Sequence, residues 1–332
     1  PAFTYTTQIY PQPPAALALV TAARLLRAGR AATPLALAGA AACAGFLPWL
    51  STRAALVALG VGVAIAYVAL RPLTPATWSQ RAMRVAAAAL PFFVPVAALV
   101  IVNGLLFGRF MLGAGYYLVS DQQPILTYAP QIGSLGLLFD CTFGLIPRAP
   151  IFLLGAAGAL MLWRRGPSPV LATLLLGCAA LFVYIASLAF WWADGGPPSR
   201  YLVAGLPLLA VLLAAGLERL AALRPAWRAV AAGLAGFSLF IAYVYAVLPH
   251  IAYDLAPDIR LSERDGQLFE FVGRLVRPSP AEAFPSIVRG TPLDFVFGAA
   301  WLASLVALVA WSRMDGARDR QGPVRASRSS SP

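Results

Sequence analysis

The sequence predicts an all-α, polytopic bundle of about nine transmembrane helices, and three observations lead to this fold class. Hydrophobic residues make up 60% of the 332 positions and charged residues 11%, whereas soluble domains average roughly 45–50% apolar and about 25% charged. The apolar residues fall in long blocks, and residues 85–107 and 169–190 contain no charge at all. Such blocks match the roughly 20 residues that a helix needs to cross hydrocarbon. The charged residues gather at the ends of the blocks.

Nine apolar stretches are long enough to be helices. They cover approximately residues 13–29, 34–49, 53–70, 84–106, 149–163, 168–190, 202–222, 226–248 and 293–312. All 25 basic residues are Arg; 16 of them, with three acids, fall at one set of helix ends, and nine, with ten acids, at the other. Because positive charge is retained on the cytoplasmic side during insertion, we expect a multi-pass protein of the inner (plasma) membrane. Its C-terminus lies in the cytoplasm.

The elements differ in how well they fit a plain transmembrane helix. The first two stretches are short, and Arg24 and Arg27 make the inner end of the first one amphipathic, as in helices that lie along an interface. Two outer connections, residues 107–148 and 249–292, are too long to be turns, and long loops of this kind are commonly functional. Within the first of them, residues 132–139 are apolar enough to dip back into the protein.

The second outer connection and the tail complete the domain organisation. Residues 260–276 have helical spacing of apolar positions (Leu261, Leu268, Phe271 and Leu275), which predicts a small extramembrane helix. Residues 1–312 therefore form the membrane domain. Residues 313–332 are rich in Arg and Ser, with too few apolar residues to bury, and predict a disordered basic cytoplasmic tail attracted to anionic lipids.

Several classes of function are excluded by composition. The arginines lie at helix ends, which favours topological anchoring over nucleic-acid binding. A single histidine and three distant cysteines (Cys43, Cys141 and Cys178) provide neither a metal site nor a disulfide framework. No nucleotide-binding, zinc-protease or serine-hydrolase motif is present, and no cofactor is implied. Since the chain begins at Pro1 without a signal-peptide pattern, we expect it to be the later part of a longer protein.

One polar cluster joins two spans on the outer side, in the sequence Phe190-Trp-Trp-Ala-Asp-Gly-Gly-Pro-Pro-Ser-Arg-Tyr201. Its aromatics suit a membrane interface, and Arg200 is interpreted either as a side chain that snorkels to headgroups or as a ligand for an anion. A guanidinium binds phosphate through two parallel hydrogen bonds. Arg200, Tyr201 and Asp194 are therefore candidate substrate-binding residues.

A second polar cluster, around Asp140 and Arg148, lies in an otherwise apolar stretch where an unpaired charge is costly. Two interpretations remain open. The two side chains pair with each other or with a neighbouring loop to hold a re-entrant segment, or they contact substrate. The first is favoured.

Four segments in this order resemble one family. They are Tyr10-Pro-Gln-Pro-Pro-Ala-Ala, Leu47-Pro-Trp-Leu, the stretch from Leu137 to Pro150 and the stretch from Trp191 to Leu-Pro207. Over residues 1 to about 215 the chain resembles the bacterial branch of the GT-C membrane glycosyltransferases, which is related to the protein mannosyltransferase-like enzymes. The resemblance implies a GT-C-like fold and transfer of a sugar from a polyprenyl-phosphate carrier at the outer face, by an inverting mechanism.

The same resemblance bears on individual residues. It implies that Arg200 faces the carrier phosphate or the sugar cavity. The family's usual catalytic acid lies in a first outer loop that has no counterpart here, and its relatives tend to carry Glu where this chain has Gln12. Sugar transfer needs a base for the acceptor and a cation near the leaving phosphate. Arg200 or Arg148 supplies the cation, whereas Asp140 and Asp194 are only the nearest candidates for the base.

The expected function is thus that of a membrane glycosyltransferase-like protein, with a polyprenyl-phosphate-linked sugar donor and membrane lipids as partners. It is expected to lack the catalytic acidic loop. The main alternative is a transporter or flippase of a lipid-linked substrate, which should need polar residues at mid-membrane. The spans contain few of these, with Tyr184 and Ser187 as mild exceptions, and this favours the enzyme. A non-catalytic scaffold would need none of the outer polar clusters.

Overall fold

The computed structural model describes most of the chain, and the regular secondary structure of its described part is entirely helical. The described residues are 11–71, 77–114, 129–188, 191–192, 199–221, 225–248, 251, 266–275, 277, 280–287 and 292–318. No strand occurs in these ranges. The all-α class predicted from the sequence is confirmed.

The long helices begin and end close to the predicted boundaries. Those of the first half are α2 (Gln12–Leu25), α3 (Pro34–Leu50), α4 (Ala55–Leu70) and α5 (Trp78–Phe107). Those of the second half are α9 (Leu153–Arg165), α10 (Pro169–Ala186), α11 (Leu206–Ala221), α12 (Pro225–Val247) and α15 (Pro292–Arg318). The largest change is at α15, which continues to Arg318, so residues 313–318 of the expected tail are helical. The rest of that tail lies outside the described residues.

Short 3-10 helices extend or link four of the long helices. They are η1 (Leu26–Ala31), η2 (Thr52–Ala54), η3 (Pro150–Phe152) and η4 (Arg200–Gly205). At η1 the backbone turns sharply, because Gly29 has a φ of 54°, a region that a residue without Cβ enters readily. The chain can therefore leave α2 and enter α3 on the same side of the bundle.

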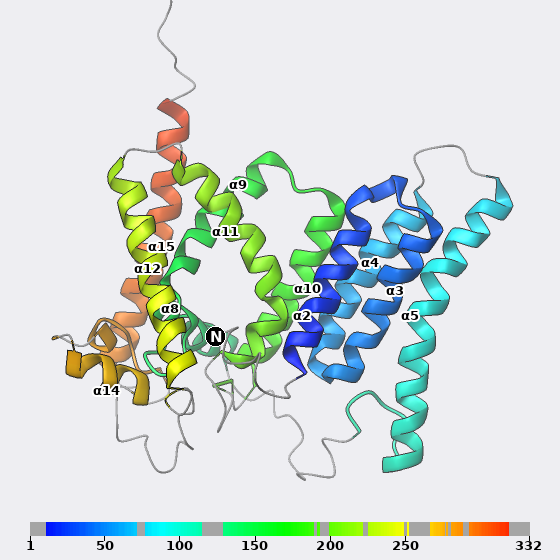
Figure 1. The fold of residues 1–332 in the computed structure, drawn as a ribbon, viewed down its shortest axis with the longest axis horizontal. Coiled ribbons are helices and arrows are strands. Elements are labelled where there is room, and N and C mark those ends of the chain that lie inside the picture. The colour runs from blue at the N-terminus through cyan, green and yellow to red at the C-terminus, as the bar shows by residue number, and fades with distance from the viewer. Residues whose placement is uncertain are drawn as a thin grey trace, which may run out of the picture.

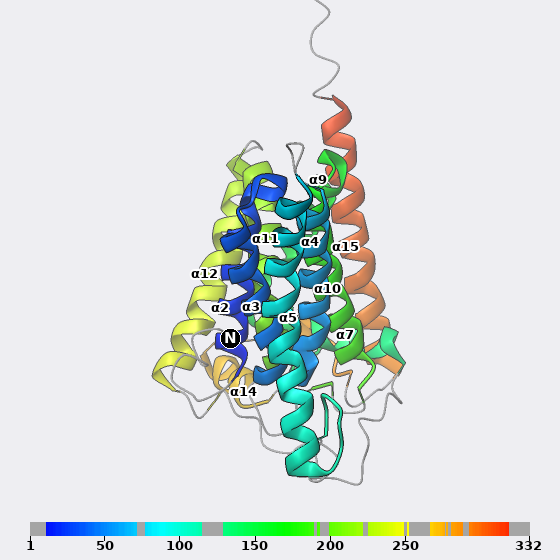
Figure 2. The same cartoon turned by 90° about the vertical axis from the view of Figure 1, so that its right-hand side faces the viewer.

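Five helical segments are long and apolar enough to cross a membrane: Thr52–Leu70, Trp78–Phe107, Pro169–Ala186, Arg200–Glu218 and Trp227–Val247. Shorter apolar helices occur at Pro34–Leu50, Pro130–Phe139 and Pro292–Ala307. The long helix α5 lies at the outer side of the bundle (Figure 2), and most of its apolar side chains are exposed, as expected of a surface that faces lipid. The chain is therefore a helical membrane protein. The prediction of nine spans goes beyond the five that length and composition support.

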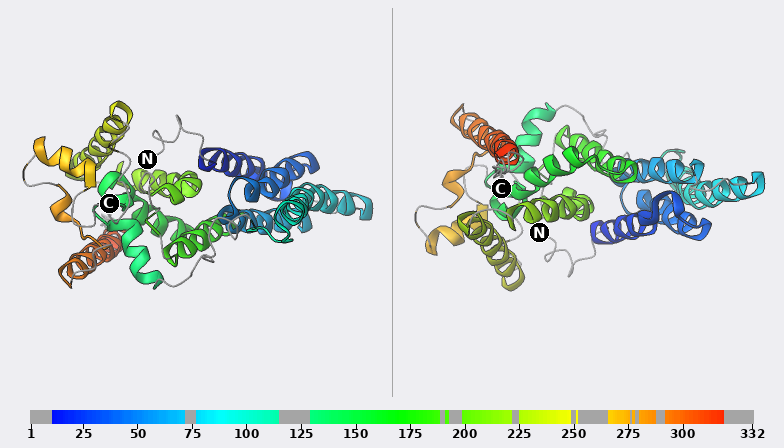
Figure 3. Two further views of the ribbon diagram at one scale, coloured as in Figure 1. Left: turned by 90° about the horizontal axis from the view of Figure 1, so that it is seen from below. Right: turned by 90° about the horizontal axis from the view of Figure 1, so that it is seen from above.

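The helices run roughly parallel to one axis and form an elongated bundle (Figure 1). Seen along that axis, α2 to α5 lie at one side, α9 to α11 in the middle, and α12, α14 and α15 at the other side (Figure 3). The connection η1, the end of α4, the start of α5, the end of α9 and the start of α12 all lie at the top in Figure 1. We call this the arginine-rich end, because those arginines of the first set that the structure describes lie on or next to these elements or near the ends of α11 and α15. The opposite end, with α7, α8, α14, η2 and η4, is called the loop end.

Glycines allow three pairs of helices to approach closely. A Cβ placed on Gly60 of α4 would lie 2.8 Å from the Cα of Gly177 of α10, and one on Gly177 would lie 3.0 Å from the Cα of Gly60. A Cβ on Gly158 of α9 would collide with the carbonyl oxygen of Leu212 of α11. Gly45 of α3 likewise faces backbone carbonyls of α5. Helices in membranes associate through such small residues, because lipid offers no hydrophobic drive for association.

At the arginine-rich end, arginine side chains bind the carbonyls that helix ends leave unsatisfied. Arg84 of α5 donates from Nη1 to the oxygen of Ala32 at 2.6 Å and from Nη2 to the oxygen of Val68 at 3.0 Å. Arg30 donates from Nε to the oxygen of Arg71 at 2.8 Å. These residues were interpreted from the sequence only as topological anchors, and they also connect α2, α4 and α5.

The two long outer connections contain short helices. The first holds α7 (Pro130–Phe139) and α8 (Leu145–Arg148), and α7 packs against the end of α10, where a Cβ on Gly133 would collide with the oxygen of Ala186. The second holds α14 (Gly266–Leu275) and η6 (Pro280–Ala283). A helix lies within the range 260–276 that the helical spacing predicted. Leu268, Phe269 and Val272 are buried, whereas Leu275 is exposed.

Candidate functional site

The turn between α7 and α8 is built around the buried carboxylate of Asp140. Its Oδ1 accepts hydrogen bonds from the backbone N–H groups of Thr142 and Phe143, both at 2.8 Å, and its Oδ2 accepts one from Ile287 at 2.7 Å. The side chain is 0% exposed. Backbone donors stabilise a buried carboxylate that would otherwise be costly. Asp140 thus fixes its own turn and joins it to residues 284–287 of the second outer connection.

Arg148 connects the same turn to α12. Its Nε donates to the hydroxyl of Tyr245 at 2.8 Å, its Nη1 donates to the oxygen of Gly144 at 3.3 Å, and its guanidinium lies 5.8 Å from the ring centroid of Phe269 on α14. The side chain is 1% exposed. Asp140 and Arg148 thus bond to neighbouring segments, as the favoured interpretation expects of residues that hold a re-entrant segment, and substrate contact by either residue stays a prediction. Tyr245 has no counterpart among the predicted site residues.

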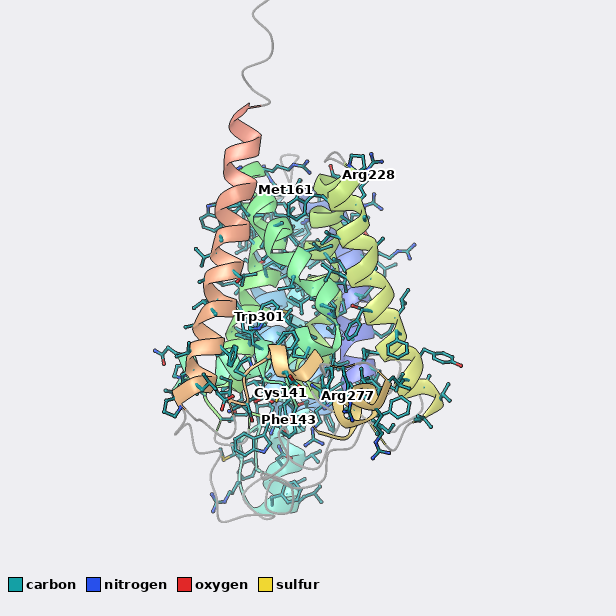
Figure 4. All side chains as sticks on the ribbon, turned by 90° about the vertical axis from the view of Figure 1, so that its left-hand side faces the viewer. Cys141, Phe143, Met161, Arg228, Arg277 and Trp301 are labelled. Carbon is teal, nitrogen blue, oxygen red and sulfur yellow. The ribbon has the colours of Figure 1, made fainter. Side chains whose placement is uncertain are left out.

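A stack of aromatic rings closes the second outer connection onto the bundle. Phe284 lies parallel to Trp301 of α15, with ring centroids 4.7 Å apart, and Phe139 stacks on Trp301 at 5.9 Å. Trp301 donates from Nε1 to the oxygen of Ala283, and the buried Asp294 accepts the N–H of Ser286. Figure 4 shows Trp301 on α15 above Cys141 and Phe143, at the opposite end of the bundle from Met161 and Arg228.

Two arginines meet on one tyrosine at the loop end. The guanidinium carbon of Arg53, from η2, lies 3.9 Å from the ring centroid of Tyr201, and Nη2 of Arg200 lies 3.2 Å from the Tyr201 hydroxyl oxygen. The guanidinium of Arg200 also lies 5.0 Å from that ring centroid. All three side chains are partly exposed. We call Arg53, Arg200 and Tyr201 the outer arginine cluster.

The position of Arg200 is set by its neighbours in the chain. Ser199 adopts a left-handed conformation with a φ of 58°, and its hydroxyl donates to the oxygen of Phe143 at 2.9 Å. This bond attaches the start of η4 to the turn that Asp140 stabilises. Trp191 is fully buried, and its ring lies against Gly136 of α7 so closely that a Cβ there would collide with it. The described residues on either side of the segment before Arg200, Trp191 and Ser199, are therefore both fixed by contacts with the bundle.

An apolar cavity of about 490 Å³ lies between α9, α10 and α11. Its walls extend from Leu145 and Ile146 at the loop end to Leu162 and Trp163 near the end of α9, and none of the described residues that line it is charged. Leu202 and Gly205 of η4 form part of the wall. The 3-10 helix that begins with Arg200 and Tyr201 thus also borders the cavity.

The structure brings some of the predicted site residues together. Arg200 and Tyr201 are in contact, and Asp140 and Arg148 are in the same buried turn, connected to Arg200 through Phe143 and Ser199. Asp194 lies outside the described residues. Arg53 was missed by the sequence analysis, although its place in an outer connection, against the general distribution of Arg, was a signal.

Among the described residues no group of three or more His, Cys, Asp or Glu could hold a metal ion. The arrangement can bind an anion at its two guanidiniums and an apolar chain in the adjacent cavity. The fold and these features define a helical membrane protein with a cationic, aromatic-lined cluster at one end of its bundle. No protein-family model, curated protein sequence or solved structure matches the chain.

Proposed function

We propose that this protein binds a polyprenyl-phosphate-linked sugar and forms the carrier-binding part of a GT-C-like membrane glycosyltransferase. The observation that carries the proposal is the outer arginine cluster. Two guanidiniums within reach of one tyrosine ring concentrate positive charge at one place. Such planar, forked donors bind phosphate through two parallel hydrogen bonds, as they also bind carboxylate.

The apolar cavity supports a lipid-linked anion over a soluble one. An isoprenoid chain needs an apolar wall that begins near the phosphate site, and η4 provides both, with Arg200 in the cluster and Leu202 at the cavity. Most ligand sites combine an apolar pocket with a few polar groups that fix orientation.

Asp140 and Arg148 have a positioning role in this proposal. They are buried and bond to backbone and to Tyr245, so they shape the turn that receives Ser199 and thereby place Arg200. The proposal concerns binding, because the cluster offers cations and a phenol but no carboxylate base among its three members. The active face is proposed to be the outer face of the plasma membrane.

The test compares variants of the cluster in donor binding. Retention of radiolabelled polyprenyl phosphate by the purified chain in detergent micelles is measured for Arg200→Lys, Arg53→Lys and the matched control Arg277→Lys, which changes an exposed arginine elsewhere at the loop end. Binding should fall roughly tenfold or more for the first two, since an ammonium cannot reproduce the fork. Lys serves equally well if these arginines are only interfacial anchors, so equal binding by all three variants would remove the cluster from the site.

A further inference from the structure

A second cavity lies at the arginine-rich end and is distinct from the proposed donor site. It has a volume of about 720 Å³ and is enclosed by α2 and η1 on one side and by α4, α10 and α11 on the other. Its deeper walls are apolar, with Leu19, Leu174, Leu208 and Val211 among them. Its rim carries three arginines: Arg24, Arg27 and Arg30.

The rim is positive without a matching acid. In the described part of the chain no Asp or Glu lines the cavity, and Glu218, an acid on the last described turns of α11, pairs with Arg165 at 3.1 Å. Other arginines of this end bind protein oxygens, as Arg84 and Arg165 do. Among the described residues, Arg24 and Arg27 have no hydrogen-bond or ion-pair partner, and both are exposed.

The start of α10 adds to the positive field. Ser168, Pro169, Val170 and Leu171 line the cavity, and they form the N-terminal cap and first turn of an 18-residue helix. The dipole of a helix start attracts anions, although Pro169 has no N–H and the N–H of Leu171 already bonds to the hydroxyl of Ser168. One end of the cavity therefore faces three guanidiniums and the N-terminus of α10, which is 18 residues long. The other end is lined by apolar side chains.

Apolar surface is present on both sides of the two free arginines. Arg24 and Arg27 also line an adjoining groove on α2, together with Leu17, Val20 and Leu25. A phosphate held between these arginines would thus have one hydrocarbon-lined space on either side. A lipid with two acyl chains fits this geometry. A free anion would contact the arginines but not the two apolar spaces.

We infer that this cavity is a binding site for an anionic phospholipid of the membrane leaflet at the arginine-rich end. The phosphate lies between Arg24 and Arg27, near Arg30 and the start of α10, and one acyl chain enters the cavity along Leu174 and Val211. Each arginine near the surface of an anionic leaflet contributes roughly a fivefold change in affinity. The inference does not depend on sugar transfer, so the two proposals can fail separately.

The test measures lipid binding to the full chain in detergent micelles by native mass spectrometry. Phosphatidylglycerol is compared with phosphatidylcholine of the same acyl chains. We expect phosphatidylglycerol to bind at least about tenfold more tightly, and the double variant Arg24→Gln/Arg27→Gln to lose that preference. The matched control Arg81→Gln/Arg164→Gln removes two exposed arginines from the same end but outside the cavity, and should keep it.

Two further measurements separate the remaining outcomes. Val211→Trp fills the cavity without changing charge, and should weaken phosphatidylglycerol binding several-fold even if the arginine variants fold poorly. Inorganic phosphate at equal phosphate concentration should not compete with the lipid. Equal loss in the control variant would indicate general surface attraction, competition by phosphate would indicate a free-anion site, and unchanged binding by Val211→Trp would place the acyl chain elsewhere. Each of these three results overturns the inference.

Discussion

A carboxylate as deeply buried as that of Asp140 is stable because three backbone N–H groups point at it. Neither carboxylate oxygen of Asp140 can be replaced by a hydrogen-bond donor without losing a bond. In Asp140→Asn the side-chain amide keeps only one acceptor oxygen. Its NH2 group then faces a backbone N–H, either of the turn or of Ile287, and two donors cannot bond to each other. A buried donor left unsatisfied costs about 1–3 kcal/mol.

We therefore expect Asp140→Asn to lower the free energy of unfolding by about 1–3 kcal/mol. Chemical unfolding in detergent micelles measures the change. The control is Glu282→Gln, which alters an exposed carboxylate on η6 in the same connection and should be neutral. A neutral Asp140→Asn would mean that the turn does not depend on the carboxylate.

The hydroxyl of Tyr245 gives a second prediction at this scale. Tyr245→Phe removes the acceptor for Nε of the buried Arg148, and bonds to charged groups contribute about 1.5–3 kcal/mol. Stability should fall by an amount in that range. Tyr243→Phe is the matched control, because Tyr243 lies on the same helix and is 66% exposed. Equal effects of the two substitutions would contradict the importance of the bond between Tyr245 and Arg148.

At the scale of helices, the close approach of α9 and α11 is the most exacting contact. A Cβ on Gly158 collides with the oxygen of Leu212, whereas a Cβ on Gly155, one turn earlier on the same helix, lies 3.8 Å from the Cβ of Leu212. The two glycines thus offer the same substitution with opposite expected results.

Gly158→Ala should separate α9 from α11 and lower the melting temperature, since overpacking of this kind typically costs about 1–3 kcal/mol. Gly155→Ala should be tolerated or slightly stabilising, because Ala is the better helix former. Thermal unfolding of both variants in the same detergent makes the comparison. A larger loss in Gly155→Ala would show that the two helices do not meet at Gly158.

The helices themselves were predictable from sequence, and the contacts between them were not. Charge-free blocks fix where a membrane helix lies, so α5 and α10 were located within a few residues at most of their ends. The favoured interpretation of Asp140 and Arg148 as residues that hold a segment rested on the cost of burying a charge. Their role in substrate contact stays a prediction. The meeting of Arg53 with Tyr201 was not predictable, because it depends on how η2 and η4 pack, and periodicity within a helix carries no information on that. For the same reason, the helical spacing did not reveal which residues of α14 are buried, since Leu268 is buried and Leu275 is exposed.

For the whole molecule, the distribution of arginine predicts orientation. Reporter fusions after Arg165 and Arg228 should report the cytoplasm, because both residues lie at the arginine-rich end and positive charge is retained inside. Fusions after Thr142 and Gly266, at the loop end, should report the outside. A cytoplasmic signal at Thr142 together with an external signal at Arg165 would invert the topology, and with it the membrane face proposed for the outer arginine cluster.

The cavity beside η4 also separates the two functions considered for the whole chain. A transporter has to carry a charged headgroup between the two ends of the bundle, and the lining of this cavity contains no charged side chain. Such a wall accommodates the hydrocarbon of a lipid-linked substrate and opposes passage of its phosphate. Among the described residues, the lining therefore favours binding at one face over translocation.

Arg84 has a consequence for the way the chain is made. Its guanidinium binds the carbonyls of Ala32 and Val68, which belong to segments synthesised earlier. Until residue 84 leaves the ribosome, those two oxygens lack this donor, although the bond from Arg30 to the oxygen of Arg71 already joins the earlier segments at that end. The order of synthesis therefore adds the fourth long helix as a second connection there. We expect the first three helices to be held together more firmly once α5 is inserted.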